Sequence, residues 1–317
     1  MRPLRFLLPL GIAIHLGVTW WRTDAGAAAS LLDVSTGWLA VAVLLAFVPW
    51  LTNGLRVWNW LRWEGERRPL RDCVRIAVAS EVGAAVTPTS VGSASVKTAM
   101  LSSRGIALPR ALSITGMGSL EDCLFFLLAV PPLVVVSGVW HEGLLGRIGA
   151  LAHDAFETPT RALVAIAMSL LFAAAFARTR WGRAVADLVA NTWREWRALL
   201  ATSVRRRPLA WSANLLLAAL QWGARYSVLT ALLYGLGLEI DPVRAFVLQW
   251  LCFTIMALVP TPGAMGGAEL VFLALFAGVI PADVLALVMS AWRMLTYYLL
   301  NLCGVGVLVV GSRERTA

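Results

Sequence analysis

The sequence predicts an all-α polytopic membrane protein with about six full spans and two re-entrant hairpins of broken helix, arranged as inverted repeats. Composition is the first reason, because 59% of the 317 residues are hydrophobic and only 14% are charged. Soluble domains lack this balance, and the mean hydropathy is +0.74. The apolar runs are also long and do not alternate, which favours helices over a barrel. Finally, proline and glycine interrupt two of the runs.

About six apolar runs are long enough to cross a bilayer as helices. Polar or basic loops separate them, and several of the 15 tryptophans fall near their ends, as is typical of a membrane interface. The predicted spans are Leu4–Trp20, Trp38–Trp60, Pro109–Val136, Ala162–Phe176, Leu209–Leu236 and Val284–Val310.

Two further apolar segments are broken near their middle. Cys73–Val86 would extend about 21 Å as a helix, too short to cross alone, and the chain breaks at Thr87–Ser93 before Ala94–Leu101. In the second segment, Val243–Val259 leads into Pro260–Glu269, and Leu270–Val279 leads out. Prolines and glycines prevent a helix at both breaks. Broken backbone at membrane depth survives only inside protein or beside a water-filled cavity, and in transporters it marks the substrate site.

The two broken segments belong to an internal repeat. Thr87–Ala94 aligns with Thr261–Ala268, and Pro69–Arg71 aligns with Pro242–Arg244. Proline, glycine and charge positions agree, which argues against chance similarity between apolar sequences. We therefore expect a single transmembrane domain over residues 1–317. Repeat 1 covers about 36–138 and repeat 2 about 208–310, and a connecting span and a basic amphipathic helix occupy 161–207.

Loop charges decide whether the repeats are parallel or inverted. If each broken segment crosses the bilayer, the repeats are parallel. If each is a hairpin that enters and leaves on one face, they are inverted, and both termini lie inside. Only the hairpin arrangement places all the basic segments on one side, which the positive-inside rule favours. These segments are Met1–Arg5, Arg62–Arg71, Arg104–Arg110, Arg178–Arg207 and the C-terminus.

The segment Arg178–Arg207 is strongly basic, and its apolar residues recur at helical spacing. This pattern predicts an amphipathic helix that lies on an anionic inner leaflet. Nucleic-acid binding is the less favoured explanation of the net charge of +9. We expect a multi-pass protein of a prokaryotic plasma (inner) membrane, with membrane lipids as its partners.

The hairpins predict an anion site. The returning half-helices begin at Ser93/Ala94 and Gly267/Ala268, and helix N-termini present free N–H groups and partial positive charge. Two such ends that converge suit the phosphate of a lipid headgroup. The predicted phosphate-binding residues are Thr87, Thr89, Gly92, Ser93, Lys97, Thr261, Gly263, Gly266 and Gly267, with Arg56 and Arg225.

Four further charged residues within apolar segments are predicted to serve coupling or gating: Glu81, Glu121, Glu269 and Arg293. Some have structural explanations too. The repeat register places Glu121 opposite Arg293, so these two could pair and lock the halves together. Glu269 could cap its half-helix or hold a proton or cation, and Glu81 is open to either kind of role. Arg56 lies near a span end, from which it could reach the interface.

The sequence offers little for catalysis or cofactors. The four cysteines and three histidines form no metal-binding or redox pattern, so we expect no metal and no cofactor. No nucleophile–base pair or nucleotide motif is recognisable, so an enzyme acting on lipid is not favoured. Two other possibilities stay open: a non-transporting scaffold for a cell-envelope lipid or glycan synthase, and a proton-coupled transporter of a small ion or solute.

Several motifs resemble one known family. Pro260–Glu269, Gly278–Pro281 and Arg293–Tyr298 in the second half, with Pro88–Lys97 and Ser102–Ile106 in the first, are similar to the lysylphosphatidylglycerol synthase transmembrane region. This is the flippase-like domain of the multiple peptide resistance factor and of stand-alone relatives. The resemblance covers nearly the whole chain, and its short motifs occur in the right order and spacing.

The resemblance implies a membrane domain that flips polar-headed lipids between leaflets, such as phospholipids, aminoacyl-phospholipids or polyprenyl-phosphate carriers. Fused members also carry a soluble synthase domain that uses aminoacyl-tRNA, which we do not expect here. Three departures from the family pattern bear on the substrate. Gly263-Ala264 replaces a Gly-Gly pair, no acid lies near Ala94, and Asp122 follows Glu121 where the family often has arginine.

Overall fold

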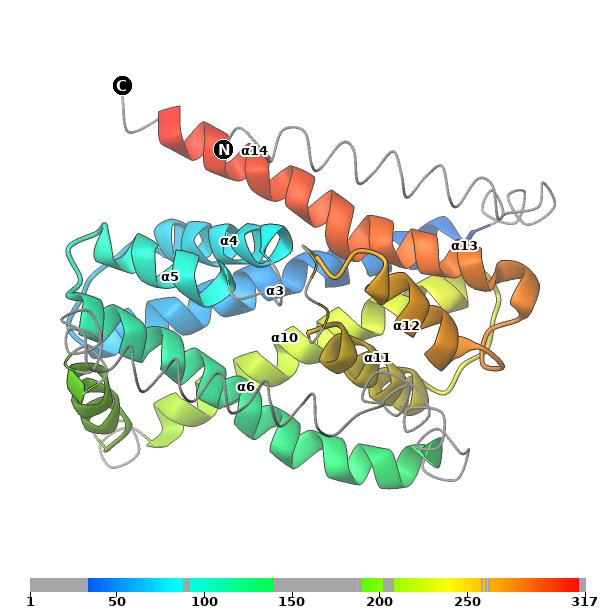
Figure 1. Cartoon of the computed structure of the whole chain (residues 1–317), viewed down its shortest axis with the longest axis horizontal. Coiled ribbons are helices and arrows are strands. Elements are labelled where there is room, and N and C mark those ends of the chain that lie inside the picture. Colours follow the sequence, from blue (N-terminus) through cyan, green and yellow to red (C-terminus); the bar gives the residue numbers. More distant parts are fainter. Residues whose placement is uncertain are drawn as a thin grey trace, which may run out of the picture.

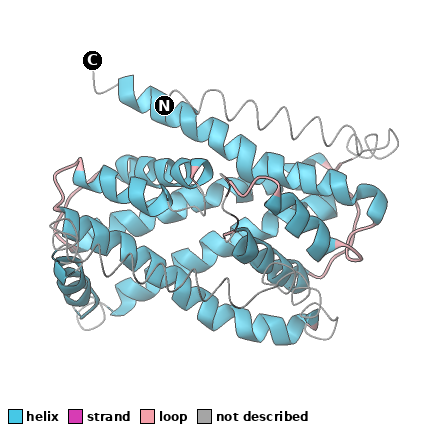
Figure 2. Ribbon diagram, in the orientation of Figure 1, coloured by secondary structure: helices cyan, strands magenta, loops and turns pink. Residues whose placement is uncertain are grey.

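The structure is a computed structural model, and it describes residues 34–87, 92–139, 187, 190–201, 208–257, 259, 261 and 263–313. These residues form helices and short connections without named strands (Figure 2). The residues predicted to form repeat 1 contain α3 (Thr36–Trp63), α4 (Leu70–Val86), α5 (Gly92–Ser102) and α6 (Leu108–Ser137). Those predicted to form repeat 2 contain α10 (Pro208–Gly235), α11 (Pro242–Met256), α12 (Gly267–Phe276), α13 (Ala282–Arg293), the π-helical η2 (Met294–Leu299) and α14 (Leu300–Arg313).

Four of these helical stretches are long and apolar enough to cross a membrane: Thr36–Trp63, Leu108–Ser137, Trp211–Gly235 and Ala282–Val309. They correspond to four of the predicted spans, and the chain is a polytopic membrane protein. The predicted spans Leu4–Trp20 and Ala162–Phe176 lie outside the described residues. Figure 1 shows α3 and α10 packed side by side at the centre and running in opposite directions. The α6 helix and the α13–α14 stretch flank them, also in opposite directions.

The broken segments form two helical hairpins, α4–α5 and α11–α12, and the helices of each hairpin pack against one another. In Figure 1 the α4–α5 hairpin lies at the end of the molecule where α3 ends and α6 begins, and α11–α12 lies at the other end. The end of α4 and the start of α12 lie near the middle. The first hairpin is closed tightly, because a Cβ added at Gly83 would lie 2.7 Å from Cγ2 of Val96, and one added at Gly92 would collide with the Gly83 carbonyl oxygen.

Two clusters of buried apolar side chains support these elements. One joins α3, α10, α11, α12 and α13 around Phe272, Phe276 and Trp292, whose rings stack. The other joins α3, α4, α5 and α6 around Trp60 and Met117. The two clusters have no residue in common, and the first supports the α11–α12 hairpin whereas the second supports α4–α5.

A helix at residues 190–201 is the described part of the predicted basic amphipathic segment; most of Arg178–Arg207 lies outside the described residues. Leu199 is buried in the Trp60 cluster, and Trp196 and Leu200 pack against it. The Ser113 hydroxyl donates to the Thr192 carbonyl oxygen over 3.1 Å. Trp193 is exposed and stacks on Trp196. Part of the apolar face therefore binds the protein's own α3–α6 cluster.

Candidate functional site

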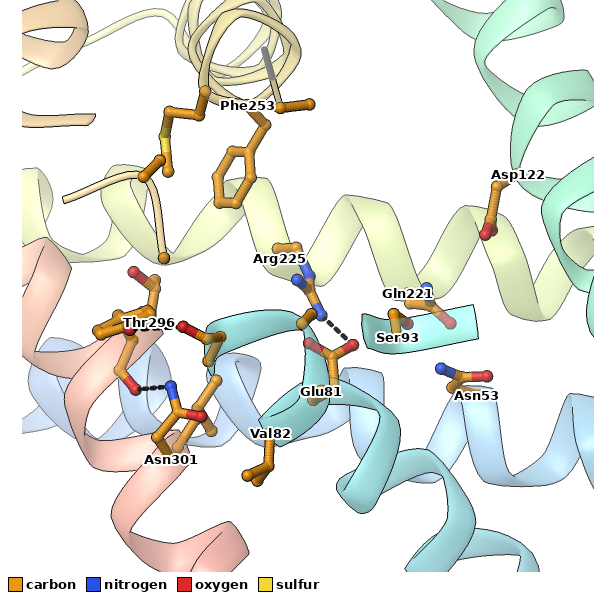
Figure 3. A pocket seen from close by; sticks show the side chains of 18 of the residues that line it. Asn53, Glu81, Val82, Ser93, Asp122, Gln221, Arg225, Phe253, Thr296 and Asn301 are labelled. Carbon is orange, nitrogen blue, oxygen red and sulfur yellow. Dashed lines mark hydrogen bonds and ion pairs between the residues drawn. The ribbon is translucent and has the colours of Figure 1, made fainter. Parts of the chain in front are cut away.

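A cavity of about 620 Å³ lies between the two hairpins and the long helices. Every described helix of both repeats except α12 contributes to its wall, as does the second break. Figure 3 shows Arg225 from α10 and Glu81 from α4 pointing toward one another in it, with Asn53 and Gln221 nearby. Six predicted residues line it: Glu81, Ser93, Lys97, Arg225, Gly263 and Arg293. Eight others do not: Arg56, Thr87, Gly92, Glu121, Thr261, Gly266, Gly267 and Glu269. Thr89 lies outside the described residues.

Arg56 is the centre of a buried network behind the cavity wall. Its Nε donates to Oε2 of Glu121 over 2.7 Å, and its Nη1 donates to Oδ1 of Asp122 over 2.8 Å and to Oε1 of Gln221 over 3.1 Å. Its Nη2 donates to the Gly118 carbonyl oxygen over 2.6 Å. The side chain is 3% exposed. Arg56 therefore points inward, and the alternative in which it reaches for the membrane interface is wrong.

Glu121 is fully buried, and both of its carboxylate oxygens are occupied. Besides the bond from Arg56, Oε1 accepts from Nε1 of Trp60 over 2.8 Å and from Nδ2 of Asn214 over 2.9 Å. The interpretation in which Glu121 pairs with Arg293 across the repeat is therefore wrong. Arg56 is the partner of this carboxylate because it lies on the neighbouring helix α3, whereas Arg293 forms its contacts within the second hairpin.

Arg293 joins the second break to the start of α12. Its Nε donates to Oε1 of Glu269 over 3.0 Å, and its Nη2 donates to the Gly263 carbonyl oxygen over 3.0 Å. The other carboxylate oxygen of Glu269 accepts from the backbone N–H of Gly266 over 2.7 Å. Of the two roles foreseen for Glu269, capping of the half-helix is confirmed. An acid here also suits the positive end of the helix dipole.

Arg225 and Glu81 form the ion pair inside the cavity. Nη2 of Arg225 donates to Oε1 of Glu81 over 2.7 Å, and their side chains are 18% and 25% exposed. The guanidinium carbon also lies 5.3 Å from the centre of the Trp222 ring. Nε of Arg225 is buried without a hydrogen-bond partner among the described residues. The pair is thus accessible from the cavity and incompletely satisfied.

Lys97 differs from every other basic residue of the cavity. It is the only lysine among the 27 basic residues of the chain. Its Nζ donates to Oδ1 of Asn53 over 3.1 Å, and within the described part of the chain it forms no ion pair with a carboxylate. An ammonium group has three donors. Lys97 therefore offers the cavity a positive charge that no carboxylate contacts.

The polar groups of the first break are used to close the hairpin. The Thr87 hydroxyl donates to the Gly83 carbonyl oxygen over 2.9 Å and accepts from the N–H of Gly92 over 2.8 Å. The hydroxyls of Ser80 and Ser93 share a hydrogen bond of 2.8 Å. In the second break, the Thr261 hydroxyl donates to the Met265 carbonyl oxygen over 3.0 Å. These threonines thus hold the turns in this structure.

Tyr297 connects the two breaks. Its hydroxyl donates to the Ala85 carbonyl oxygen over 2.9 Å, near the end of α4. Its ring lies against Gly263, where an added Cβ would overlap it. The Arg293 guanidinium lies over the same ring, 4.7 Å from its centre. Tyr297 belongs to η2, and π-helical turns within α-helices are frequent at functional sites.

Sequence reasoning missed several polar or aromatic residues of the wall. Asn53, Asp122 and Gln221 are polar residues inside apolar spans, so intramembrane polarity was an available signal for each. The aromatic wall had no comparable signal, because aromatic residues in a membrane helix more often pack in the core or at the interface. It consists of Trp222, Phe253, Trp292 and Tyr297.

Comparison with known proteins gives the family. The family described as "Lysylphosphatidylglycerol synthase TM region" matches residues 8–304. The chain belongs to this family. A UPF0104 membrane protein from Archaeoglobus fulgidus is 25% identical over 271 residues, which cover 82% of this chain and 82% of that protein. Family membership and the apolar helices identify a multi-pass membrane protein of a family linked to lipid handling.

Proposed function

We propose that this protein translocates a lipid with an anionic headgroup between the leaflets of a membrane. The class includes phospholipids, aminoacyl-phospholipids and polyprenyl-phosphate carriers. Family membership supports lipid handling, and a cavity of about 620 Å³ between the two breaks offers space for a headgroup. Transport rather than catalysis is proposed, with neither metal nor cofactor. Among the described residues, no group of three or more His, Cys, Asp or Glu is placed to hold a metal ion.

The proposal includes a membrane topology of inverted repeats with re-entrant hairpins and both termini inside. The opposite directions of α3 and α10 and the placement of the hairpins at opposite ends support it (Figure 1). The distribution of charge in the loops also supports this topology. The connections that flank α4–α5 carry Arg67, Arg68 and Arg104, besides Glu64 and Glu66, whereas those that flank α11–α12 carry no Lys or Arg. The proposed location is the plasma (inner) membrane of a prokaryote, and the Archaeoglobus relative is prokaryotic.

The proposed partners are membrane lipids, an anionic inner leaflet bound through Arg178–Arg207, and a cell-envelope synthase. Exposed Arg194 and Arg197 on the helix at residues 190–201 support the contact with the leaflet, because polybasic helices are attracted to anionic lipid. Nucleic acid is not proposed, since the basic residues of a membrane protein have this simpler use.

The ammonium group of Lys97 is the observation that carries the proposal. The arginines at the cavity already contact carboxylates, so they are not unpaired cations available to bind phosphate, as the sequence suggested. Lys97 alone among the described cations there contacts only an amide oxygen. A lipid phosphate that enters the cavity would supply the missing negative charge, because charge-assisted hydrogen bonds between ammonium and phosphate are favourable in a site shielded from water.

A vesicle experiment tests this function. The purified protein is reconstituted into phosphatidylcholine vesicles with trace tail-labelled phosphatidylglycerol, and exchange between leaflets is followed with a membrane-impermeant quencher. We expect exchange well above that of empty vesicles. K97M should lose most of it, and K97R should retain more because it keeps the charge. R71M, which removes an exposed charge outside the cavity, is the matched control and should resemble the wild type.

Wild-type exchange no faster than that of empty vesicles, also with a tail-labelled aminoacyl-phospholipid and a polyprenyl phosphate, would refute lipid translocation. Exchange in K97M equal to that of the wild type would remove Lys97 from the path. Because Lys97 is the only lysine, reductive methylation with ¹³C-formaldehyde labels one side-chain amine besides the N-terminus. Its NMR signal should shift when phosphatidylglycerol is added to protein in zwitterionic detergent.

A further inference from the structure

The charges at the cavity cancel. Five line it directly: Glu81, Lys97, Asp122, Arg225 and Arg293. Three more, Arg56, Glu121 and Glu269, are ion-paired with members of that set or with one another. Among the described residues this gives as many carboxylates as cations, with a formal charge of zero. A neutral cavity that receives an anion acquires an uncompensated charge, which is costly in a site whose charged side chains are only partly exposed. An accompanying cation would remove that cost.

Two of the carboxylates are occupied on both oxygens. Glu121 accepts from Arg56, Trp60 and Asn214. Glu269 accepts from Arg293 and from the backbone N–H of Gly266. A proton on either carboxylate would have to displace a donor that is already in place. These two acids are therefore poor acceptors for a cation that enters with the ligand.

Glu81 and Asp122 each use one oxygen only. Oδ1 of Asp122 accepts from Arg56 and from Nε1 of Trp222 over 2.9 Å, and Oε1 of Glu81 accepts from Arg225. No described group donates to the second oxygen of either carboxylate. Their counter-ions differ, because Arg56 also contacts Glu121, Gln221 and a backbone carbonyl, whereas Arg225 contacts Glu81 and the Trp222 ring.

Arg225 is consequently the arginine that can turn to a ligand. Its Nε has no hydrogen-bond partner among the described residues, and a guanidinium binds phosphate oxygens in the same forked geometry as it binds a carboxylate. When Arg225 turns to a phosphate, Glu81 loses the one ion-pair partner that the described part of the chain gives it. A proton bound to the second carboxylate oxygen of Glu81 would then restore the charge balance of the cavity.

We propose that an anionic headgroup passes through this cavity together with a proton, and that Glu81 carries the proton. The inference rests on the proposed lipid translocation and adds its coupling ion. The proton binds a carboxylate oxygen of Glu81 when the phosphate draws Arg225 away, and it leaves when Arg225 returns. The ionisable groups that share the cavity with Glu81 are Lys97 on α5, Asp122 on α6, Arg225 on α10, Arg293 on α13 and Tyr297 on η2, with Arg56 on α3, Glu121 and Glu269 behind them.

The direction of the effect follows from this exchange. Lipid and proton move together, so a pH gradient should drive the labelled lipid into the leaflet on the more alkaline side. With one proton per lipid, a gradient of one pH unit balances a ratio of about ten between the leaflets. A headgroup that carries its own ammonium can supply the cation for Glu81 itself, so it needs no proton. Tail-labelled phosphatidylethanolamine should therefore show no asymmetry under the same gradient.

The test uses the full chain in phosphatidylcholine vesicles with tail-labelled phosphatidylglycerol and an imposed gradient of one pH unit. We expect severalfold to tenfold asymmetry for the wild type and for E239Q, which removes an exposed acid outside the cavity. E81Q should lose the asymmetry, because its amide is similar in size but does not titrate. A pH-sensitive dye in the lumen gives a second readout from the wild type alone: net phosphatidylglycerol movement should change the luminal pH.

The outcomes separate this inference from the function on which it rests. No exchange of any labelled lipid would refute translocation itself. Exchange that is indifferent to the gradient, with no change in luminal pH, would refute proton coupling and leave translocation standing. Loss of asymmetry in D122N but not in E81Q would assign the proton to Asp122 instead. A gradient of Na⁺, rather than of protons, that drives the asymmetry would overturn the choice of ion.

Discussion

Arg56 and Arg225 show how the same ion-pair chemistry serves two ends in one molecule. Both arginines lie on the central helix pair, and both contact a carboxylate over 2.7 Å. Arg56 is 3% exposed and meets four acceptors, and its partner Glu121 has no unused oxygen. Arg225 is 18% exposed, and no described residue bonds to its Nε or to the second carboxylate oxygen of Glu81. A saturated pair fixes the fold, whereas an unsaturated pair can exchange partners.

Their position in the fold explains the difference. Arg56 extends from α3 to α6, where Asn214 and Gln221 of α10 complete the network. Arg225 extends from α10 to the α4–α5 hairpin and faces the cavity. Buried charges need a full set of partners to persist. Incomplete satisfaction at Arg225 therefore supports the proposal that this site binds a ligand.

The largest effect is expected from replacing Arg56, the arginine of the saturated pair. R56A leaves Glu121 buried without its counter-ion, which destabilises proteins by about 3–5 kcal/mol. R225A should cost much less, because Glu81 is partly exposed and can be solvated from the cavity. Unfolding of the two variants in detergent micelles, followed by helical circular dichroism in a denaturant series, measures the difference. Equal losses of stability would show that the two pairs are equivalent.

The sequence predicted the helices and breaks well, because long apolar runs and Pro-Gly interruptions are local signals. Predicted Leu209–Leu236 and observed Pro208–Gly235 differ by one residue at each end. The last span was predicted as one helix, and the structure divides it into α13, η2 and α14. No local pattern indicates the π turn, which lies where Tyr297 reaches Ala85 of the first hairpin. Such a contact depends on tertiary packing.

The site was only partly predictable, because charges inside spans are conspicuous but their partners are not. Sequence reasoning found Glu81, Lys97, Arg225 and Arg293 in the cavity. It paired Glu121 with Arg293 from the repeat register, whereas Arg56 on the adjacent helix is the partner. A repeat alignment gives equivalent positions in two halves, and equivalent positions need not be in contact. Only the side-chain geometry shows which cations are paired with carboxylates.

A smaller effect is expected from a substitution in the second break, which tests the contact between the hairpins by itself. Gly263 has a φ of 60°, and an added Cβ would overlap the Tyr297 ring. G263A should therefore destabilise the protein by about 1–3 kcal/mol and slow lipid exchange, because the break and η2 must separate. Gly266 is the matched control. Its φ of 82° is also positive, but nothing lies within 4 Å of an added Cβ, so G266A should show backbone strain alone.

Comparison of the two glycine variants separates steric conflict from strain. G263A should be the more destabilised, and Y297A should recover part of the loss in a double variant because it removes the overlapping ring. Thermal unfolding of detergent-solubilised protein and the vesicle exchange assay give the two readouts. Equal behaviour of G263A and G266A would show that the contact between Gly263 and Tyr297 has no part in stability or exchange.

The smallest effect concerns the serine pair that flanks the unsaturated site. Ser80 and Ser93 share a hydrogen bond of 2.8 Å between α4 and α5, and Ser93 also lines the cavity. A neutral hydrogen bond contributes about 0.5–1.5 kcal/mol, and replacing both partners together costs less than the sum of the single changes. S80A, S93A and the double variant form a cycle whose coupling energy in denaturant unfolding should fall in that range.

If S93A slows phosphatidylglycerol exchange while S80A does not, the Ser93 hydroxyl serves the ligand, as its place beside the break predicts. Equal exchange rates in the two single variants would limit Ser93 to closing the hairpin, and the binding role would then rest on Lys97 and Arg225.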